Sequence, residues 1–431
     1  MKPRIAIIGT GIAGLGCAHA LKEHYDVTLF EKEGTAGGHS NTVSAGQVPV
    51  DTGFMVYNNT TYPRLTQLFA DLGVEEQTAP MSFSLQCMQL EYCGHDLNTF
   101  FAQRKNLLSP RLYRLLFHIR RFNRQARSFL AESRTARHSL GEFLLEKNYH
   151  PDLVQLYLIP MCAAIWSSSF EDMLNYPASV LFRFLQNHGL LGFSTHLEWK
   201  TLKGGSRSYV DRLVSKIGGR LRLQTQVLAV RRGGGGVKIQ AMDPDNAVYV
   251  EEFSKAILAT HADQALALLE KPTDLEEDIL SSFRYSRNPT YLHTDESVMP
   301  KERRAWAAWN YRLENPGLVA TTHYWMNRLQ ALPGPTNYFV SLDGRERPEI
   351  DREKIVKKIL YHHPIFDHEA IEAQRRLPLL NEAGPVYFCG SYFGYGFHED
   401  ALNSGQQAAF RALNDRVAPN SRAALDRWAE A

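Results

Sequence analysis

Short apolar runs alternate with glycine-rich turns at the start of the chain. Residues 4–8 form an apolar run long enough for one buried strand, residues 15–21 have the composition of a helix, and residues 25–30 form a second apolar run. This succession predicts a strand, a tight turn, a helix and a second strand. Later runs predict a hairpin with strands at residues 221–230 and 237–241, and another buried strand at residues 255–260.

The pattern changes in two other stretches. From residue 60 to about residue 200 it becomes mostly helical, beginning with a predicted helix at residues 62–72. From about residue 274 to residue 377 the predicted strands are rich in aromatic residues. An aromatic residue at strand spacing is more often part of the core than of a pocket. We therefore expect a second domain built from two separate stretches of the chain.

One predicted helix, spanning residues 104–127, is basic and amphipathic. Apolar residues recur along it at roughly helical spacing, and no acidic residue occurs between residues 97 and 131. Such a helix suits the surface of an anionic membrane, where each basic residue contributes about 1 kcal/mol. The alternative is the solvated face of an ordinary domain helix. Its basic residues are Arg104, Lys105, Arg111, Arg114, Arg120, Arg121, Arg124 and Arg127.

Composition narrows the class of protein. The 431 residues suffice for two or three domains, and a net charge of +2 indicates no general affinity for nucleic acid. No apolar run approaches the roughly 20 residues that span a bilayer, and the first apolar run is too short for a signal peptide. The five cysteines include no CxxC pair, which predicts neither disulfides nor zinc. No histidine spacing predicts a metal site. We expect a cytoplasmic protein.

The first turn carries a dinucleotide-binding pattern. Gly9, Gly11 and Gly14 follow the first predicted strand, with Ile12 and Ala13 between the last two glycines, and Glu31 ends the second strand. Such glycines permit a tight turn, close approach of a pyrophosphate and close packing of helix on strand. The pyrophosphate then lies on the positive end of the helix. Glu31 would accept hydrogen bonds from the adenosine ribose, with Lys32 beside it.

A second glycine pair favours FAD over NAD as the predicted cofactor. Gly37 and Gly38 follow Glu31 within one loop, and His39 and Ser40 supply donors toward phosphate or flavin. NAD dehydrogenases have no need of a second glycine clamp so soon after the ribose acid, so we predict FAD. The alternative is a solvent-exposed hairpin. Gly53 and Phe54 continue the pattern downstream.

The order of these motifs resembles that of the superfamily of flavin-containing amine oxidases, phytoene desaturases and protoporphyrinogen oxidases. Gly204 and Gly205 resemble its glycine pair near the flavin ring, and the stretch from residue 386 to residue 405 resembles its C-terminal flavin motif. The resemblance implies an α/β, Rossmann-like FAD-binding domain with a discontinuous mixed α+β substrate domain. It places Val227 at the adenine, and a helix N-terminus at the flavin O2 edge. The further cofactor contacts that it implies are Gly390, Ser391, His398, Glu399 and Ala401.

A narrower likeness covers residues 160–166, 187–191, 292–295 and 309–311. These sequence segments are similar to those of a bacterial group of predicted FAD-binding proteins. That group resembles the flavoprotein domain fused to plant cyclopropane fatty acid synthases. The likeness implies a lipid setting rather than a particular reaction.

The chain also departs from the amine oxidase pattern. Asn288 or a neighbour stands where those enzymes carry a lysine, and no Gly-Gly-Cys precedes the last strand, so we expect non-covalent FAD. Tyr392, Tyr395 and Phe397 are candidates for the wall of an apolar substrate slot, and His398 is a candidate acid–base group. Alternatively, these aromatic residues only pack against the flavin.

The sequence thus predicts an FAD-dependent oxidoreductase. Residues 1–59, 201–273 and 378–431 form the expected FAD-binding domain, and residues 60–200 and 274–377 the expected substrate domain. The expected substrate is apolar, a fatty acyl chain or membrane lipid, which gives a hydride to flavin N5. Three alternatives stay open: an amine oxidase, a redox-neutral fatty acid isomerase, and a non-catalytic flavoprotein partner of a lipid-modifying enzyme.

Overall fold

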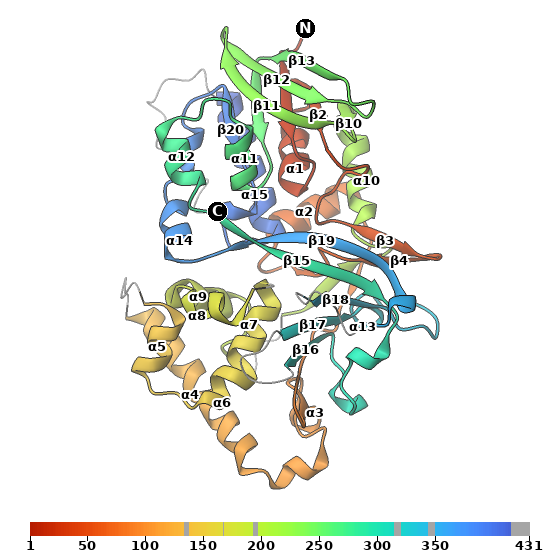
Figure 1. The fold of residues 1–431 in the computed structure, drawn as a ribbon, viewed down its shortest axis with the longest axis vertical. Helices are drawn as coiled ribbons and strands as arrows, with labels where there is room; N and C mark the ends of the chain where they lie inside the picture. The colour runs from red at the N-terminus through yellow and green to blue at the C-terminus, as the bar shows by residue number, and fades with distance from the viewer. Residues whose placement is uncertain (133–137, 167, 193–196, 314–319, 344–349, 415–431) are drawn as a thin grey trace. The chain divides into compact units, whose positions relative to one another are not determined.

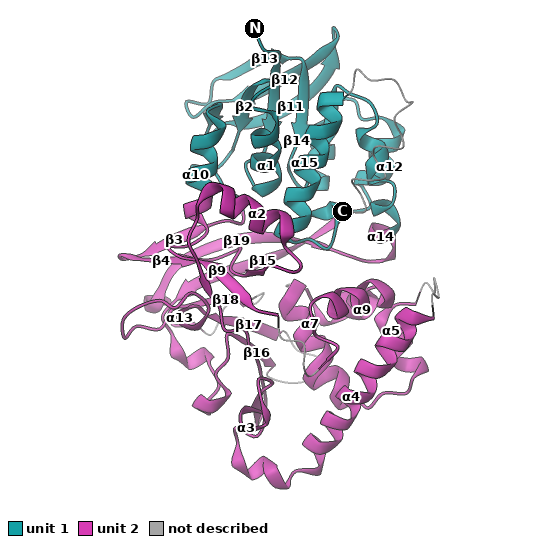
Figure 2. Cartoon of the chain, turned by 180° about the vertical axis from the view of Figure 1, so that it is seen from behind, with its two compact units in different colours: residues 1–38, 210–283, 372–431 teal, residues 39–209, 284–371 magenta. Residues whose placement is uncertain are grey.

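The computed structural model describes residues 1–132, 138–166, 168–192, 197–313, 320–343 and 350–414. The chain divides into two compact units (Figure 2). Unit 1 comprises residues 1–38, 210–283 and 372–431, and unit 2 comprises residues 39–209 and 284–371. Each unit is therefore assembled from stretches that lie far apart in the sequence.

These units do not share the boundaries of the predicted domains. Residues 39–59 and 201–209 belong to unit 2, although we expected them in the FAD-binding domain. Residues 274–283 and 372–377 belong to unit 1, although we expected them in the substrate domain. The last part of the predicted FAD-binding domain, residues 415–431, lies outside the described residues. The assignment of cofactor and substrate to separate domains stays a prediction.

Unit 1 contains a five-stranded parallel sheet with the strand order β10-β2-β1-β14-β20 (Figure 1). Strands β1, β2 and β14 are almost wholly buried, as is typical of a parallel sheet covered on both faces. The strands are β1 (Arg4–Ile8), β2 (Asp26–Phe30), β10 (Arg220–Arg222), β14 (Lys255–Leu258) and β20 (Val386–Phe388). The predicted strand at residues 4–8 is confirmed.

Helix α1 (Ile12–Leu21) packs closely on α15 (His398–Asn414), so the two ends of the described chain meet in unit 1. A Cβ atom at Gly405 would lie 2.1 Å from the carbonyl oxygen of Ala13, which means that only glycine permits this approach. The other helices of unit 1 are α11 (Ala262–Leu268), α12 (Asp274–Leu280), η6 (Leu377–Asn381) and η7 (Ser391–Phe393). Helices α10 (Arg207–Ile217) and α14 (His368–Gln374) cross the boundaries between the units.

A three-stranded antiparallel sheet completes unit 1. It consists of β11 (Gln226–Gly233), β12 (Gly236–Met242) and β13 (Val248–Phe253). The prediction of one strand over residues 221–230 is wrong. That stretch is divided between β10, which joins the parallel sheet, and β11, which begins the hairpin. Gln224 between them has a φ of +50°, so the chain turns there instead of continuing as a strand.

Unit 2 is organised around a seven-stranded mixed sheet with the order β19-β15-β18-β17-β16-β7-β8. Only the β16–β7 pair is parallel among its ladders in the described residues. The strands are β7 (Phe83–Cys87), β8 (Leu90–Cys93), β15 (Arg284–His293), β16 (Trp309–Leu313), β17 (Ala320–Trp325), β18 (Phe339–Asp343) and β19 (Ile355–Ile365). The aromatic residues of these strands mostly line the core, as expected for strand spacing.

Two smaller sheets lie in the same unit. They are the hairpin of β3 (Thr42–Ala45) and β4 (Val48–Asp51), and the sheet β5-β9-β6 formed by Tyr57–Asn58, Trp199–Leu202 and Glu76–Thr78. The hairpin packs through Ala45 and Val50 onto a core cluster that includes Leu292 and Val340 of the large sheet.

Helices make up most of the rest of unit 2, and α4 (Pro110–Ala131) has 22 residues. The predicted basic helix at residues 104–127 is in fact two elements, because Ser109 is extended and Pro110 starts a new helix. The helices are α2 (Pro63–Leu72), α3 (Leu97–Phe100), η1 (Arg104–Leu108), α4 (Pro110–Ala131), α5 (Leu140–Glu146), α6 (Pro151–Leu153), η2 (Val154–Leu158), α7 (Ile159–Trp166), α8 (Phe170–Asn175), α9 (Ala178–Asn187), η3 (Glu296–Val298), η4 (Arg303–Ala305), α13 (Met326–Leu329) and η5 (Arg352–Lys354).

Two further observations concern only the part of the chain that the structure describes. None of its helices combines the length and the apolar character needed to cross a bilayer. Within the same residues, no group of three or more His, Cys, Asp or Glu side chains is placed to hold a metal ion.

Candidate functional site

The turn after β1 is shaped by close backbone contacts. Gly9 has a φ of +99°, and a Cβ atom there would lie 2.5 Å from the carbonyl oxygen of Ala259, at the end of β14. A Cβ atom at Gly14 would lie 2.1 Å from the carbonyl oxygen of Gly9. The first and third glycines are thus required by the packing of the chain on itself.

The middle glycine differs from the other two. The position of a Cβ atom at Gly11 has no atom within 4 Å, so the space in front of this residue is open. Gly11 caps α1 without a side-chain hydrogen bond, and the first turn of the helix has no acidic residue. Helix α1 therefore presents its positive end and its first N–H groups to an open space, the arrangement that binds a pyrophosphate.

The Glu31 carboxylate, directly after β2, is held in place by hydrogen bonds from Thr10 and Glu33. Its side chain is 9% exposed, and its Oε2 accepts hydrogen bonds from both the hydroxyl and the N–H of Thr10. Its Oε1 accepts from the N–H of Glu33 at 3.0 Å. A carboxylate has about four acceptor positions, so Glu31 keeps capacity for a ribose hydroxyl. Lys32 is exposed and lies 3.8 Å from a carboxylate oxygen of Glu33.

The loop after Glu31 returns to the glycine turn. The N–H of Gly37 donates to the carbonyl oxygen of Thr10 at 3.0 Å, and a Cβ atom at Gly38 would lie 3.2 Å from the Cα of Gly11. The second glycine pair is thus brought against the first motif. Val227 lies farther along, in β11, where a bulge follows it.

The C-terminal motif lies in the same unit as the first glycine turn. A Cβ atom at Gly390, after β20, would lie 3.2 Å from the carbonyl oxygen of Thr260, which follows β14. The hydroxyl of Ser404 accepts a hydrogen bond from the N–H of Gly390 at 2.9 Å. Because β14 lies between β1 and β20, the loops after all three strands lie at one edge of the sheet. Ligands of such sheets bind at this edge.

The aromatic loop at residues 391–397 is anchored by two side chains that sequence reasoning missed. Gln374 donates hydrogen bonds from Nε2 to the carbonyl oxygens of Tyr392 and Gly394, at 3.0 and 2.6 Å. Asp400 accepts from the N–H of Phe397 at 3.0 Å. Burial raises the pKa of Asp400 from 3.8 to about 7, against the effect of these backbone donors.

The predicted site residues of this loop have different surroundings. Tyr392 is 1% exposed, and its ring packs against those of Phe283 and Phe393. Tyr395 and Phe397 keep partial exposure, and Ser391 begins η7. Burial lowers the pKa of His398 to about 3, so its imidazole is neutral at physiological pH. Glu399 follows it in the first turn of α15, and Ala401 is buried in the same helix.

In unit 2, the stretch that begins at His39 runs alongside the one that ends at Phe54. The N–H of Phe54 donates to the carbonyl oxygen of His39 at 2.7 Å, and a Cβ atom at Gly53 would lie 2.3 Å from that same oxygen. Ser40 is 1% exposed and its hydroxyl bonds to that of Tyr209. The ring of Phe54 packs near those of Tyr57 and Phe69. The side chains of Ser40 and Phe54 thus contribute to packing.

A buried carboxyl group joins the β3–β4 hairpin to the segment that follows Gly204 and Gly205. Asp51 is 1% exposed and accepts hydrogen bonds from the Thr42 hydroxyl, from the N–H and hydroxyl of Ser206, and from Nε2 of Gln330 at 3.0 Å. Burial raises its pKa from 3.8 to about 6. Gly205 has a φ of +88°, and a Cβ atom there would lie 2.7 Å from Thr42. Gly205 is therefore positioned by this cluster, whereas a Cβ atom at Gly204 would meet open space.

A second cluster, which we call the β15–β19 cluster, gathers around the ring of His39. This ring stacks on Tyr361 with centroids 4.8 Å apart and lies 5.4 Å from the ring of His363. The Asn288 amide bonds to Nδ1 of His363 at 2.8 Å. Burial lowers the pKa of His363 to about 3. The Tyr361 hydroxyl bonds to Thr52 and accepts from Asn41. The cluster comprises His39, Asn41, Thr52, Asn288, Tyr361 and His363.

Sequence reasoning had pointed to only part of this cluster. The sequence singles out Asn288, because amine oxidases carry a lysine there, and His39, whereas His363 is one of 16 histidines without a motif of its own. Tyr361 and Gln330 carried no signal, because their partners lie more than 250 residues away in the chain. The structure brings His39 together with Asn288 and His363 in unit 2, and the two terminal motifs together in unit 1.

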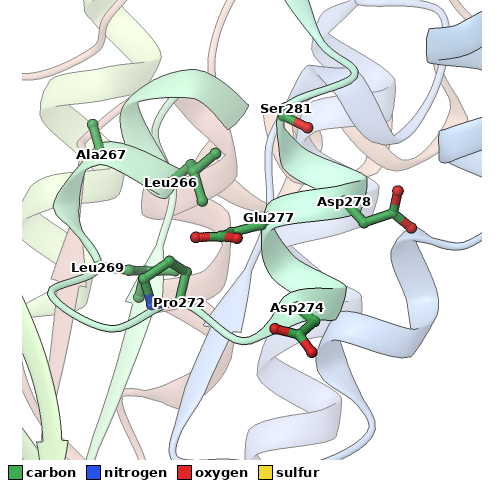
Figure 3. Close-up of a pocket in the computed structure, with 8 residues that line it drawn as sticks. All are labelled: Leu266, Ala267, Leu269, Pro272, Asp274, Glu277, Asp278 and Ser281. Atoms are coloured by element: carbon green, nitrogen blue, oxygen red, sulfur yellow. The ribbon is translucent and has the colours of Figure 1, made fainter.

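A surface pocket elsewhere in unit 1 is unrelated to these motifs. It lies between α11 and α12, and three carboxylates border it (Figure 3). None of the predicted site residues lines it. Its lining residues are Leu266, Ala267, Leu269, Pro272, Asp274, Glu277, Asp278 and Ser281.

The residues of unit 1 fit a dinucleotide. The open space at Gly11, the uncapped N-terminus of α1 and the buried acceptor Glu31 match a pyrophosphate and a ribose in turn. Comparison with known proteins agrees. The model of the flavin-containing amine oxidoreductases matches residues 12–364. The mitochondrial protoporphyrinogen oxidase of Nicotiana tabacum is 40% identical over 81 residues, which are 18% of this chain and 16% of that enzyme.

Solved structures resemble the chain over nearly its whole length. Cyclohexylamine oxidase from Brevibacterium oxydans superposes with a TM-score of 0.71 at 15% identity, covering 96% of this chain and 100% of that one. Putrescine oxidase bound to putrescine gives 0.69 at 14% identity, covering 96% and 99%. A CLA-producing fatty acid isomerase from P. acnes also gives 0.69 at 14% identity, covering 96% and 99%. At these identities the likeness concerns the fold, and the predicted fold class is confirmed.

Proposed function

Because the chain belongs to the family of flavin-containing amine oxidoreductases, and is thus an FAD-dependent oxidoreductase, we propose that it oxidises an apolar substrate, a fatty acyl chain or a membrane lipid. The observation that carries this proposal is the β15–β19 cluster. It contains no carboxylate, lysine or arginine, although it includes Asn288, at or near the position where amine oxidases commonly carry a lysine. An uncharged cluster suits an uncharged acyl chain.

The protonation states in the cluster support the same substrate. The depressed pKa of His363 keeps its imidazole neutral, and burial raises the pKa of Tyr361. Asp51 lies outside the cluster, although its charge acts on Tyr361, and it accepts hydrogen bonds from Thr42, Ser206 and Gln330. The cluster itself offers no carboxylate to pair with an ammonium group.

The roles of the individual residues follow from their positions. Gly11, the N-terminus of α1 and Glu31 would hold the pyrophosphate and ribose of FAD. When bound, the flavin supplies the acceptor for a hydride. Tyr395 and Phe397, on the loop anchored by Gln374 and Asp400, would form part of the apolar wall. His363, kept neutral, would hold the Asn288 amide in one orientation.

Redox-neutral isomerisation is the second candidate. The fold is similar to that of a fatty acid isomerase, and an uncharged cluster would suit the acyl substrate of such a reaction as well. It differs from the first proposal in requiring no external electron acceptor, because the hydride returns to the substrate.

The test is anaerobic mixing of the purified holoprotein with fatty acids and phospholipids, and separately with biogenic amines. We expect loss of the oxidised-flavin absorbance with a lipid and none with an amine. Bleaching by an amine alone would overturn the lipid proposal. If neither panel bleaches the flavin, mass spectrometry of the lipid separates an isomerase, which alters double bonds, from a flavoprotein that only supports a lipid-modifying partner.

The Asn288→Asp variant tests whether the β15–β19 cluster takes part in flavin reduction by lipid. Asn288→Asp places a carboxylate beside His363, and we expect the rate of flavin reduction by lipid to fall roughly tenfold or more, because a buried charge disfavours an apolar chain. The flavin content of this variant should equal that of the wild type, since no glycine or acidic residue of the nucleotide motif is changed. An unchanged rate of flavin reduction would show that the β15–β19 cluster does not contact the substrate.

A further inference from the structure

Large exposed apolar side chains gather at the junction of η1 and α4. Leu107 is 46% exposed, Leu108 90%, Tyr113 50% and Phe117 63%. Contiguous apolar side chains of this size on a protein surface indicate a site of interaction. Arg120 and Arg124 are exposed farther along the same helix. We call these six residues the α4 patch.

The patch occupies one face of α4, away from the core. Tyr113, Phe117, Arg120 and Arg124 follow one another at intervals of four, three and four residues, which places them on one stripe of a helix. The buried residues form a second stripe, and at 100° per residue the two stripes point in nearly opposite directions. The buried stripe consists of Leu112, Leu115, Ile119, Phe122 and Ala126.

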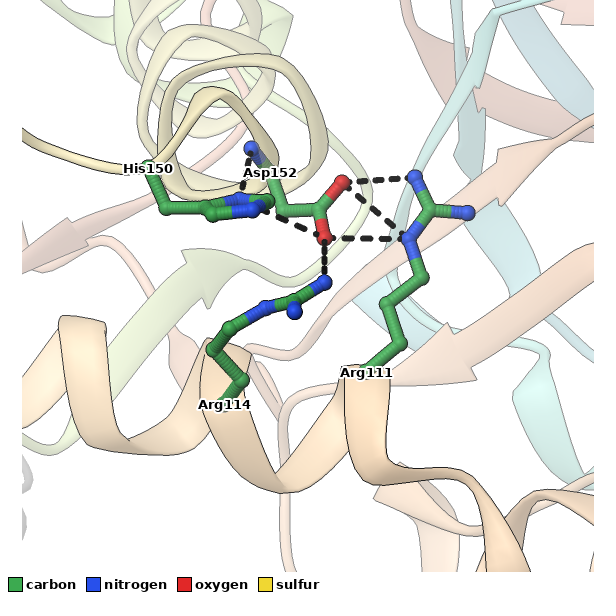
Figure 4. Close-up of polar contacts among 4 residues, drawn as sticks. All are labelled: Arg111, Arg114, His150 and Asp152. Atoms are coloured by element: carbon green, nitrogen blue, oxygen red, sulfur yellow. Dashed lines mark hydrogen bonds and ion pairs between the residues drawn. The ribbon is translucent and has the colours of Figure 1, made fainter.

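Two basic residues near the start of α4, Arg111 and Arg114, contact one carboxylate of the protein (Figure 4). Arg111 binds Asp152 at the start of α6 side-on, through one edge of its guanidinium group, with Nη2 2.6 Å from Oδ1 and Nε 3.0 Å from Oδ2. Arg114 lies 3.4 Å from Oδ2 of Asp152, and His150 lies 3.5 Å from the same oxygen. These contacts lower the pKa of Asp152 and fix which face of α4 is turned outward.

We propose that the α4 patch docks on the surface of an anionic phospholipid bilayer. Leu107, Leu108, Tyr113 and Phe117 would enter the boundary between headgroups and acyl chains, with Arg120 and Arg124 at the lipid phosphates. No acidic residue occurs between residues 97 and 131, so the charge of this region complements an anionic surface. A second copy of the chain is disfavoured, because symmetric docking would bring like charges together.

Vesicle flotation of the holoprotein tests the proposal. We expect binding to vesicles of phosphatidylcholine with phosphatidylglycerol, and little to phosphatidylcholine alone. Leu108→Asp with Phe117→Asp should weaken binding at least tenfold by removing two inserted side chains. Arg120→Glu with Arg124→Glu should weaken it roughly 30-fold, and added salt should weaken the wild type in the same direction.

Matched controls change similar residues outside the patch. Leu145→Asp alters an 82% exposed leucine of α5, and Arg352→Glu with Lys357→Glu reverses two exposed charges in and after η5. Both should bind as the wild type does. Circular dichroism and flavin absorbance establish that each variant is folded.

Three results would overturn the proposal. One is the failure of wild-type protein to float with anionic vesicles. The second is an equal loss of binding in the control variants. The third is a wild-type dimer that the patch variants convert to a monomer without any change in lipid binding, since the patch would then cover a second copy. A Phe117→Trp variant adds a direct readout, because quenching by brominated lipids reports insertion of this side chain.

Discussion

The two units differ in the hydrogen bonding of their polar groups. At the glycine turn of unit 1, side chains are absent and backbone N–H groups face open space at the N-terminus of α1. In unit 2, buried polar side chains satisfy one another in closed networks around Asp51 and His363. The difference indicates two tasks: unit 1 can receive an anionic ligand through its main chain, whereas unit 2 holds buried polar side chains in a fixed geometry.

Burial shifts the pKa of titratable groups in both units. Burial raises the pKa of Asp51 to about 6 and lowers that of His363 to about 3, so both shifts favour the uncharged form. In unit 1, burial acts in the same direction near the aromatic loop, where it raises the pKa of Asp400 to about 7 and lowers that of His398 to about 3. The predictions below test the open glycine turn of unit 1 and the buried networks of unit 2, beginning with the largest expected effect.

The first prediction contrasts two glycines of one motif. Gly14→Ala should destabilise the protein by at least about 4 kcal/mol, because the new Cβ atom would lie 2.1 Å from a backbone oxygen that has no room to move. Gly11→Ala meets open space at a φ of −63°, so the apoprotein should keep its stability within about 1 kcal/mol. Thermal unfolding of the apoproteins measures both.

The same pair also tests the cofactor site. Gly11→Ala should weaken FAD binding about tenfold or more, since the methyl group would occupy the approach of the pyrophosphate. Titration of the apoprotein with FAD, followed by flavin fluorescence, gives the affinity. If Gly11→Ala bound FAD normally, the open space at this residue would not be the pyrophosphate site.

The second prediction concerns His363. Its folded-state pKa is about 3, below the ordinary 6.5, so the unfolded chain binds the proton more readily between these values. The stability that this neutral group contributes is therefore present above pH 6.5 and is lost as the pH falls toward 3. Between pH 7 and pH 4, the wild type should lose about 3 kcal/mol more than His363→Gln. Urea unfolding at the two pH values measures the difference.

The third prediction has the opposite sign. The folded-state pKa of Asp51 is raised from 3.8 to about 6, so its contribution is present below pH 3.8 and is lost as the pH rises through 6. From pH 4 to pH 7, the stability of the wild type relative to Asp51→Asn should fall by about 2 kcal/mol. If the same urea unfolding series gave a rise instead, the folded-state pKa of Asp51 would lie below 3.8 and the predicted direction of its shift would be wrong.

The smallest expected effect is that of Gln374→Ala. The variant removes two hydrogen bonds to the loop at residues 391–397, which we expect to cost about 1–2 kcal/mol. FAD affinity should change little, whereas the KM for the substrate should rise, because the loop would lose its anchor. Gln264→Ala, at an exposed position of α11, is the matched control and should leave both quantities unchanged.

Local signals predicted unit 1 better than unit 2. The glycine turn, α1 and β2 follow one another within the first 30 residues, so the strand–turn–helix pattern was visible directly in the sequence. The large sheet of unit 2 pairs β7 with β16, more than 220 residues later in the chain. No local sequence pattern predicts a pairing between strands so far apart in the chain. The division of residues 221–230 between two sheets was missed for the same reason, since both parts are ordinary strand sequence.

The sequence by itself determined the family, the parallel β-α-β unit and the glycines and acid of a dinucleotide site, because these depend on neighbouring residues and on backbone conformation. Only the tertiary structure decided which polar side chains meet. It joined Asp51 to Gln330, His39 to Tyr361 and His363, and Arg111 to Asp152, and it turned one stripe of α4 toward solvent. Such contacts depend on how distant segments pack, and burial then sets the charge that each group carries.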